Sequence, residues 1–255
     1  MQRGNILFIS LLLASISGSL VFIISFIINI SFLGIVGLII VAISFTFLMV
    51  IPQKFRRENI FAESFFSTIF GLSKIISHFD AKGNGFIIPP TALTDKFLLY
   101  IPYMQERLSE IPLGIRKPNR YMLVNRGLLF LPIGFSLVEL FEKKLNINFS
   151  SIGLFDLAEL MHQILVDKFN MVTNIYIEVF SNKILVQLVD SMFFDLSYRL
   201  SIEMPKILTQ IGNPLSSAIG CILSKISERI VYVASYKLNT SKKLTEIVYI
   251  LSKTI

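Results

Sequence analysis

An uncharged apolar run near the N-terminus constrains this chain more than any other feature. Between Ile6 and Ile51, 46 residues pass without a Lys, Arg, Asp, Glu or His. A helix rises about 1.5 Å per residue, so the run would form a rod of roughly 70 Å, about twice the roughly 30 Å of a bilayer core. The run therefore predicts two transmembrane helices, at residues 6–28 and 32–51, joined at Asn29 and Ser31.

The charges that flank the run predict its orientation. Arg3 precedes it, and Lys54, Arg56 and Arg57 follow it. Because basic residues favour the cytoplasmic side, we expect a multi-pass protein of the cell membrane with both termini in the cytoplasm and the lipid bilayer as a partner. A cleaved signal peptide is the alternative, but the run is much longer than the about 7–15 apolar residues of such a segment.

The overall composition excludes several classes of function. The chain has 255 residues, a net charge of +7 and one cysteine. Four of its basic residues are the flanks just named, which leaves 20 basic against 17 acidic side chains from Glu58 onward. The charge therefore does not indicate nucleic-acid binding. A lone Cys221 excludes an internal disulfide and a thiolate zinc site, and we predict no metal and no cofactor.

Beyond Pro52 the chain predicts a linker helix and then a separate domain. Apolar residues recur at helical spacing through residues 58–80, at Phe61, Phe65, Ile69, Leu72, Ile76 and Phe79. The pattern predicts an amphipathic helix whose stripe packs on its own domain, lies in the lipid interface or pairs with a second copy. The predicted organisation is a hairpin at 1–57, this helix at 58–80 and a cytosolic domain at 85–255.

The C-terminal domain reads as α+β, with a mixed or antiparallel sheet built from hairpins and helices packed on it. Two apolar, β-branched pairs of segments are joined by short polar turns and predict hairpins at 173–180 with 183–190 and at 230–237 with 244–252. Shorter strands are expected at 86–88, 96–101 and 128–131. Helices are expected at 136–145, 156–168, 194–211 and 214–227, the third of these by position between the hairpins.

Helix-start signals support two of these helices. Asp156 with Glu159 three residues later has the form of a capping box. Asn213 is a good N-cap, and Pro214 suits the first helical position that follows it.

Reactive constellations are scarce. The chain lacks the glycine-rich phosphate loops and the Gly-x-Ser-x-Gly elbow. Its two histidines, His78 and His162, have no second ligand at metal spacing, although His162 follows Glu159 on one helix. Asp190, Asp195 and Glu203 could form a carboxylate pair for acid–base chemistry, although solvated acids are commoner. Basic residues around Pro118 predict a solvated loop or a partner surface, at Arg116, Lys117, Arg120 and Arg126. No catalytic residue is predicted.

The stretch from Gly212 to Gly220 is the most unusual in the chain. Its helix start carries hydroxyl and small side chains, and free N–H groups at such a start can receive an anion or a polar ligand. We therefore predict Asn213, Ser216 and Ser217 as ligand-binding residues. Close packing of two helices is the alternative explanation for the small residues.

Three short motifs carry a resemblance to a known family. Gly85-x-x-Ile88-Pro89-Pro90, Leu131-Pro132-x-Gly134 and the segment 211–219 resemble an uncharacterised archaeal family with two N-terminal membrane helices and a cytosolic α/β domain. Many members have Cys where this chain has Asn213 and Ser216, so the resemblance implies no metal or redox role here. The order of elements also looks distantly like vinyl-reductase-type small-molecule-binding domains, a likeness of fold that supplies no site residue.

The sequence thus predicts a non-enzymatic domain that binds an apolar small molecule, a lipid or a protein partner, with self-association to a homo-oligomer. The missing catalytic set and the many Phe and Ile residues motivate this hypothesis. An enzyme that acts on lipid or isoprenoid substrates with carboxylates is the alternative. A purely structural assembly protein is a third reading, and a pocket of roughly 300 Å³ or more would argue against it.

Overall fold

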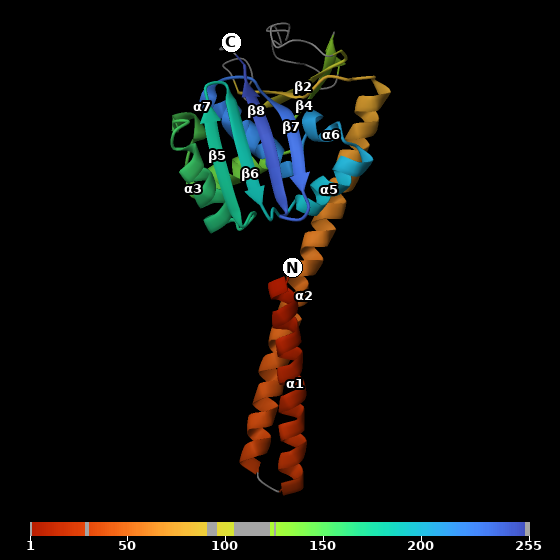
Figure 1. The fold of residues 1–255 in the computed structure, drawn as a ribbon, viewed down its shortest axis with the longest axis vertical. Coiled ribbons are helices and arrows are strands. Elements are labelled where there is room, and N and C mark those ends of the chain that lie inside the picture. Colours follow the sequence, from red (N-terminus) through yellow and green to blue (C-terminus); the bar gives the residue numbers. More distant parts are fainter. Residues whose placement is uncertain (1, 29–30, 91–95, 105–122, 125, 253–255) are drawn as a thin grey trace. The chain divides into compact units, whose positions relative to one another are not determined.

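The computed structural model describes residues 2–28, 31–90, 96–104, 123–124 and 126–252. The chain divides into two compact units, Met1–Phe61 and Ala62–Ile255. Figure 1 traces the elements of both along the chain.

The first unit pairs helix α1 (Gln2–Ile28) with the beginning of helix α2 (Ser31–His78). Glycines hold the two helices close, because a Cβ on Gly18 would lie 2.9 Å from Cγ2 of Ile40, and one on Gly37 would lie 2.8 Å from the Gly18 carbonyl oxygen. Ser25 and Ser44 are buried in the same unit. The small residues of the run therefore pack its two helices against each other.

The predicted transmembrane hairpin is wrong. Among the described helices, none combines the length and the apolar character that crossing a bilayer requires. The membrane spans predicted at 6–28 and 32–51 are therefore wrong, and so is the multi-pass cell-membrane location with cytoplasmic termini. Helix α1 covers the first predicted span and α2 begins close to the second, but the apolar run does not determine where α2 ends. Helix α2 continues past Pro52 and the charged residues Lys54, Arg56, Arg57 and Glu58 as far as His78.

In the described part of the second unit, eight strands form one fully antiparallel sheet, in the order β3-β4-β2-β1-β7-β8-β6-β5. The α+β class and the antiparallel sheet are therefore as predicted. The strands are β1 (Phe86–Ile88), β2 (Leu98–Pro102), β3 (Leu123–Val124), β4 (Gly127–Phe130), β5 (Asn174–Phe180), β6 (Lys183–Val189), β7 (Val231–Asn239) and β8 (Leu244–Leu251).

The two predicted hairpins form the largest part of this sheet. β5 and β6 pair from Asn174 opposite Val189 to Phe180 opposite Lys183, and β7 pairs with β8. Alternation in β8 buries Thr245, Ile247, Tyr249 and Leu251 on the face that the helices cover. Both hairpins are thus confirmed.

Helices cover one face of the sheet, as Figure 1 shows for α3 and α7 behind β5–β8. The helical elements are α3 (Phe135–Leu145), η2 (Phe149–Ser151), α4 (Leu157–His162), the π-helical η3 (Gln163–Lys168), α5 (Phe194–Glu203), α6 (Ile207–Gln210) and α7 (Pro214–Ser227). The main core lies between these helices and the sheet, and 11 of the residues of α7 are buried. A smaller cluster around Phe86, Tyr100 and Leu129 lies on the other face.

Three local predictions need correction. The helix expected at 194–211 is two helices, because Pro205 interrupts it between Glu203 and Ile207. The helix expected at 156–168 changes to π-helical geometry at Gln163. Asp156 makes no capping hydrogen bond, since its backbone (φ −85°, ψ −5°) is already helical and its carboxylate cannot reach the free N–H groups.

The stripe of the predicted linker helix packs on its own domain. Ile69 and Ile76 are buried in the main core, with Phe65 and Leu72 against it. Phe66, which is outside the predicted stripe, is buried too. Of the three alternatives for this helix, packing on the adjacent domain is the one that the structure shows.

Candidate ligand-binding groove

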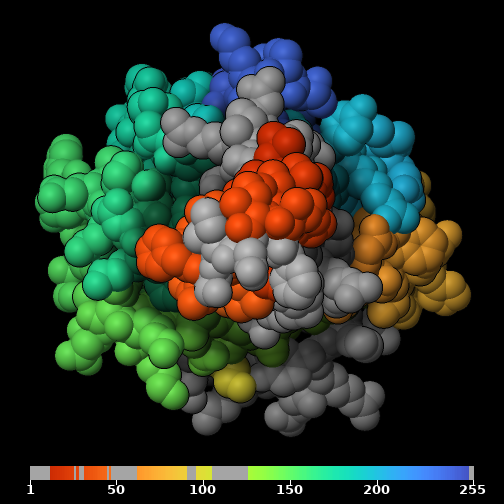
Figure 2. Space-filling model, turned by 90° about the horizontal axis from the view of Figure 1, so that it is seen from below, coloured from red at the N-terminus to blue at the C-terminus, as the bar shows by residue number. Residues whose placement is uncertain are grey.

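A hollow of the second unit lies between the end of α2 and the segment 203–210. We call it the α2 groove, and its volume is about 570 Å³. One wall is formed by the α2 side chains from Phe70 to Ser77, the end by the turn 80–82, and the opposite wall by residues 203–207. Figure 2 shows the surfaces of these two segments, orange and light blue, beside one another.

The floor of the groove is apolar and belongs to the core. Ile76, Ala81 and Ile207 are each at most 6% exposed and belong to the main core. Buried Gln210 fixes the turn, because its side-chain amide nitrogen donates to the carbonyl oxygens of Ala81 (3.0 Å) and Gly83 (3.1 Å). The groove is therefore a preformed feature of the folded domain.

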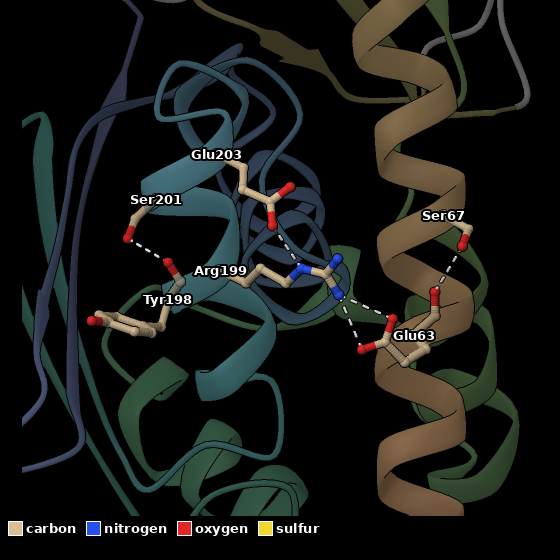
Figure 3. Close-up of polar contacts among 6 residues, drawn as sticks. All are labelled: Glu63, Ser67, Tyr198, Arg199, Ser201 and Glu203. Atoms are coloured by element: carbon tan, nitrogen blue, oxygen red, sulfur yellow. Dashed lines mark hydrogen bonds and ion pairs between the residues drawn. The ribbon is translucent and has the colours of Figure 1, made fainter.

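A cluster of polar and aromatic contacts fastens α2 to α5 beside the groove. Arg199 donates from one guanidinium nitrogen to both carboxylate oxygens of Glu63 at 3.0 Å and from Nε to Glu203 at 2.8 Å (Figure 3). Its guanidinium carbon also lies 3.5 Å from the ring centroid of Phe66. Hydrogen bonds to Glu203 and Glu63 raise the pKa of Arg199 above its usual value. We call these residues the α2–α5 clamp.

The clamp determines the charge balance of the groove. Glu203 lines the groove but is engaged by Arg199, and Asp80 is engaged by Lys82 at 2.9 Å. In the described residues neither Lys74 nor Lys206 has an ion-pair partner, although the Lys74 ammonium lies 5.0 Å from the ring centroid of Phe70. Two uncompensated positive charges thus flank an apolar floor.

A second hollow adjoins the first around the same turn. Its volume is about 420 Å³, and it shares Asp80, Lys82 and Lys206 with the α2 groove. Its further lining includes Tyr103 and Met104, and Met104 is 77% exposed. The basic residues of the turn and of the segment before α6 therefore face two adjacent hollows.

The predicted ligand-binding residues lie elsewhere, in a buried cluster at the start of α7. Asn213 caps the helix, since its Oδ1 accepts from the Ser216 amide at 2.7 Å and Ser216 Oγ accepts from the Asn213 amide at 2.9 Å. The side-chain Nδ2 of Asn213 also donates to Ser197 Oγ (2.6 Å) and to the Tyr236 hydroxyl (2.9 Å). We call these four residues the α7 cap cluster. Asn213, Ser216 and Ser217 are each at most 3% exposed.

Burial in this region affects the phenols that contact it. Desolvation raises the pKa of Tyr236 well above its ordinary value, although the hydrogen bond with Ser197 opposes the shift. Tyr249, whose hydroxyl donates to the Ser216 carbonyl at 2.8 Å, also has a raised pKa because it is buried. Both phenols are neutral donors at ordinary pH. The cluster is thus a satisfied internal network, and ligand binding by Asn213, Ser216 and Ser217 stays a prediction.

The three motifs behind the family resemblance meet around this helix start. The Gly134 amide donates to Ser217 Oγ at 3.1 Å, and a Cβ on Gly134 would collide with the backbone of Ala218. Gly85 donates to the Thr209 carbonyl at 3.1 Å, and a Cβ there would collide with the Gln210 backbone. The small residues therefore permit close backbone approach, which is the alternative that the sequence left open.

The other candidates are not brought together. Asp190 pairs with Lys243 at 3.0 Å, while Glu203 belongs to the clamp. His162 lies 3.7 Å from Asp167 rather than pairing with Glu159. Among the described residues, no group of three or more His, Cys, Asp or Glu could hold a metal ion. Arg116, Lys117 and Arg120 lie outside the described residues, and Arg126 is exposed.

Sequence reasoning did not identify the groove. Its lining residues come from 70–82 and 203–210, segments more than 100 positions apart, and neither contains a motif. A signal was present in the basic residues Lys74, Lys82 and Lys206 among apolar neighbours, but only the fold places them together.

Comparisons of the chain with protein-family models, with curated proteins and with solved structures find no match. The family resemblance and the likeness to vinyl-reductase-type domains therefore stay predictions. The candidate site is defined by its own geometry.

Proposed function

We propose that this protein binds a small amphipathic anion in the α2 groove, with the apolar part of the ligand on the floor and its charge between Lys74 and Lys206. The observation that carries the proposal is an apolar groove whose acidic lining residues, Asp80 and Glu203, are already engaged, while two of its lysines have no ion-pair partner among the residues that the structure describes. Ligand sites commonly combine an apolar surface with a few polar groups that fix orientation.

The size of the groove favours ligand binding over a purely structural role. Its volume of about 570 Å³ exceeds the roughly 300 Å³ at the lower end of small-molecule sites. The carboxylates invoked for an enzyme are engaged by different basic residues, Asp190 by Lys243 and Glu203 by Arg199. Binding without turnover is therefore the function that the geometry supports best.

The absence of tryptophan from the chain provides a direct test. Phe70→Trp places a single tryptophan on the wall of the groove, where Phe70 is 41% exposed. We expect decanoate to shift its emission to the blue at saturation. The matched control is Phe155→Trp, because Phe155 is fully exposed and does not line the groove. Equal responses from both variants, or none from Phe70→Trp, would contradict the proposal.

The preference for an anion is tested separately with decanol, which has the same chain without the charge. Two exposed lysines should favour decanoate by about fivefold, because a surface charge pair contributes about 0.2–1 kcal/mol. Lys206→Glu should abolish the preference, while Lys168→Glu on exposed Lys168 should retain it. Equal binding of decanoate and decanol to the unaltered groove would support a ligand site there but contradict its preference for an anion.

A further inference from the structure

The two edges of the sheet differ in length and in what protects them. One edge is β3, a strand of two residues, and the other is β5, a strand of seven. Figure 1 shows β5 as the outer strand beside β6. A long edge strand presents a row of backbone groups that can pair with another chain.

Backbone groups that face the free edge of β5 can be identified from the hydrogen bonds of β6. Next to the two ends of β6, the Asn182 carbonyl accepts from the Leu251 amide of β8, and the Asp190 amide donates to the carbonyl of Lys243, directly before β8. Since bonding directions alternate along a strand, the odd-numbered residues of β6 face β5, and their partners are the even-numbered residues of β5. The N–H and C=O groups of Ile175, Ile177 and Val179 therefore point away from the sheet.

This edge has little of the protection that natural sheets use. β5 contains no proline and pairs with β6 without a bulge, and Glu178 is its one charged residue. Tyr176, Val179 and Phe180 are 54%, 42% and 50% exposed. The Ile175 amide is held by the neighbouring Asn174 Oδ1 at 2.8 Å, which confirms that it does not bond to β6.

We propose that the β5 edge pairs antiparallel with β5 of a second copy of this chain, across a two-fold axis at Ile177. This register places Ile177 opposite itself and Ile175 opposite Val179 of the second copy. The Ile175 amide then exchanges its hydrogen bond with Asn174 Oδ1 for one with the Val179 carbonyl of the second copy. On the exposed face, Tyr176 lies opposite Glu178 of the second copy. The two sheets then continue as one.

Charge selects this register and this occupant. Pairing centred on Glu178 would place two carboxylates directly opposite each other, which is destabilising. Centring on Tyr176 would leave the Val179 amide beyond the last outward-facing partner within the strand. Only the Ile177 register engages the whole edge and separates the acids, so a second β5 is complementary to the first.

Mixed cysteine variants of the full chain test the register directly. Tyr176 and Glu178 of different copies form a non-hydrogen-bonded pair, with Cα atoms about 4.5 Å apart, within disulfide range. Under mild oxidation with copper phenanthroline, a mixture of Tyr176→Cys and Glu178→Cys should form a cross-linked dimer on a non-reducing gel. Each variant alone should not, because the diagonal spacing of about 7–8 Å is too long.

The native cysteine does not interfere, because Cys221 is fully buried. Cross-linking confined to the mixture supports the proposal. Cross-linking that is equal in the separate variants, or absent from the mixture, overturns it.

A charge pair at one position provides the second measurement. Tyr176→Lys should tighten the dimer about fivefold by facing Glu178 of the second copy, and Tyr176→Glu should weaken it by a similar factor. Both side chains lie on the exposed face, so the fold of each copy is retained. Sedimentation equilibrium measures the dissociation constant of each dimer. Equal dissociation constants for the two variants would overturn the proposal.

Discussion

The α2 groove and the α7 cap cluster are both rich in polar groups, but they use them in opposite ways. In the cap cluster buried Asn213, Ser216 and Ser197 and half-buried Tyr236 bond to one another. In the groove Lys74 and Lys206 are exposed and lack ion-pair partners among the described residues. The difference teaches that the number of polar side chains does not identify a binding site; what matters is whether the fold already uses their bonding capacity.

Asn213→Ala should produce the largest loss of stability. It removes the N-cap of α7 and leaves buried partners unsatisfied, so the free energy of unfolding should fall by about 3 kcal/mol. Urea denaturation of the full chain measures the loss. Asn148→Ala is the matched control, because exposed Asn148 caps the short η2 and its removal should cost no more than about 1 kcal/mol. Equal losses would mean that burial adds nothing to the cap.

Alkaline pH should destabilise the protein through the same cluster. Burial raises the pKa of Tyr236 in the folded state, so its contribution is fully present below the unfolded value of about 10 and is lost as pH rises towards the folded value. Above pH 10, Tyr236→Phe should reduce the decline in unfolding free energy by up to about 1.4 kcal/mol per pH unit. Exposed Tyr198→Phe should follow the unaltered protein, and the same slope in both variants would contradict this.

Arg199→Met should have a smaller and local effect. It breaks both ion pairs of the α2–α5 clamp, which are exposed and therefore weak, and removes the contact with Phe66. Amide hydrogen exchange should rise in the part of α2 after residue 61 more than in β8. Lys243→Met, which removes the exposed pair with Asp190, should leave α2 unchanged. Uniform acceleration in both segments would show that the clamp does not act locally.

Charge reversal in the groove should have the smallest effect on stability. Lys74→Glu and Lys206→Glu alter exposed side chains without ion-pair partners in the described residues. The free energy of unfolding, measured by urea denaturation, should therefore change by no more than about 0.5 kcal/mol. The same variants should weaken decanoate binding. A large loss of stability would show that these lysines, like the cap cluster, stabilise the fold. The contrast between the groove and the cap cluster would then not hold.

Local patterns predicted much of the second unit. The β5–β6 and β7–β8 hairpins and the start of α7 at Asn213 are encoded by neighbouring residues, so the sequence shows them directly. β3 was missed because it is two residues long. The sequence predicts one long helix across Pro205, whereas the proline separates α5 from α6.

Features that depend on distant contacts were beyond prediction. The apolar run indicated helices correctly, but its interpretation as membrane spans was wrong, since α2 continues through charged residues to His78. The groove needs α2 and the segment before α6 to meet, and no local signal encodes that meeting. Asn213 was correctly identified as a cap, but its contacts with Ser197 and Tyr236 come from other elements.

The hydrogen bond between the Gly134 amide and Ser217 has a kinetic consequence. The two residues are 83 positions apart, so the bond forms only after a long stretch of chain has closed into a loop. Closing such a loop costs entropy before the contact can repay it, and contacts of this kind tend to slow folding. Protection of the Gly134 amide in a pulse-labelling experiment would therefore date the moment at which the start of α3 docks on α7.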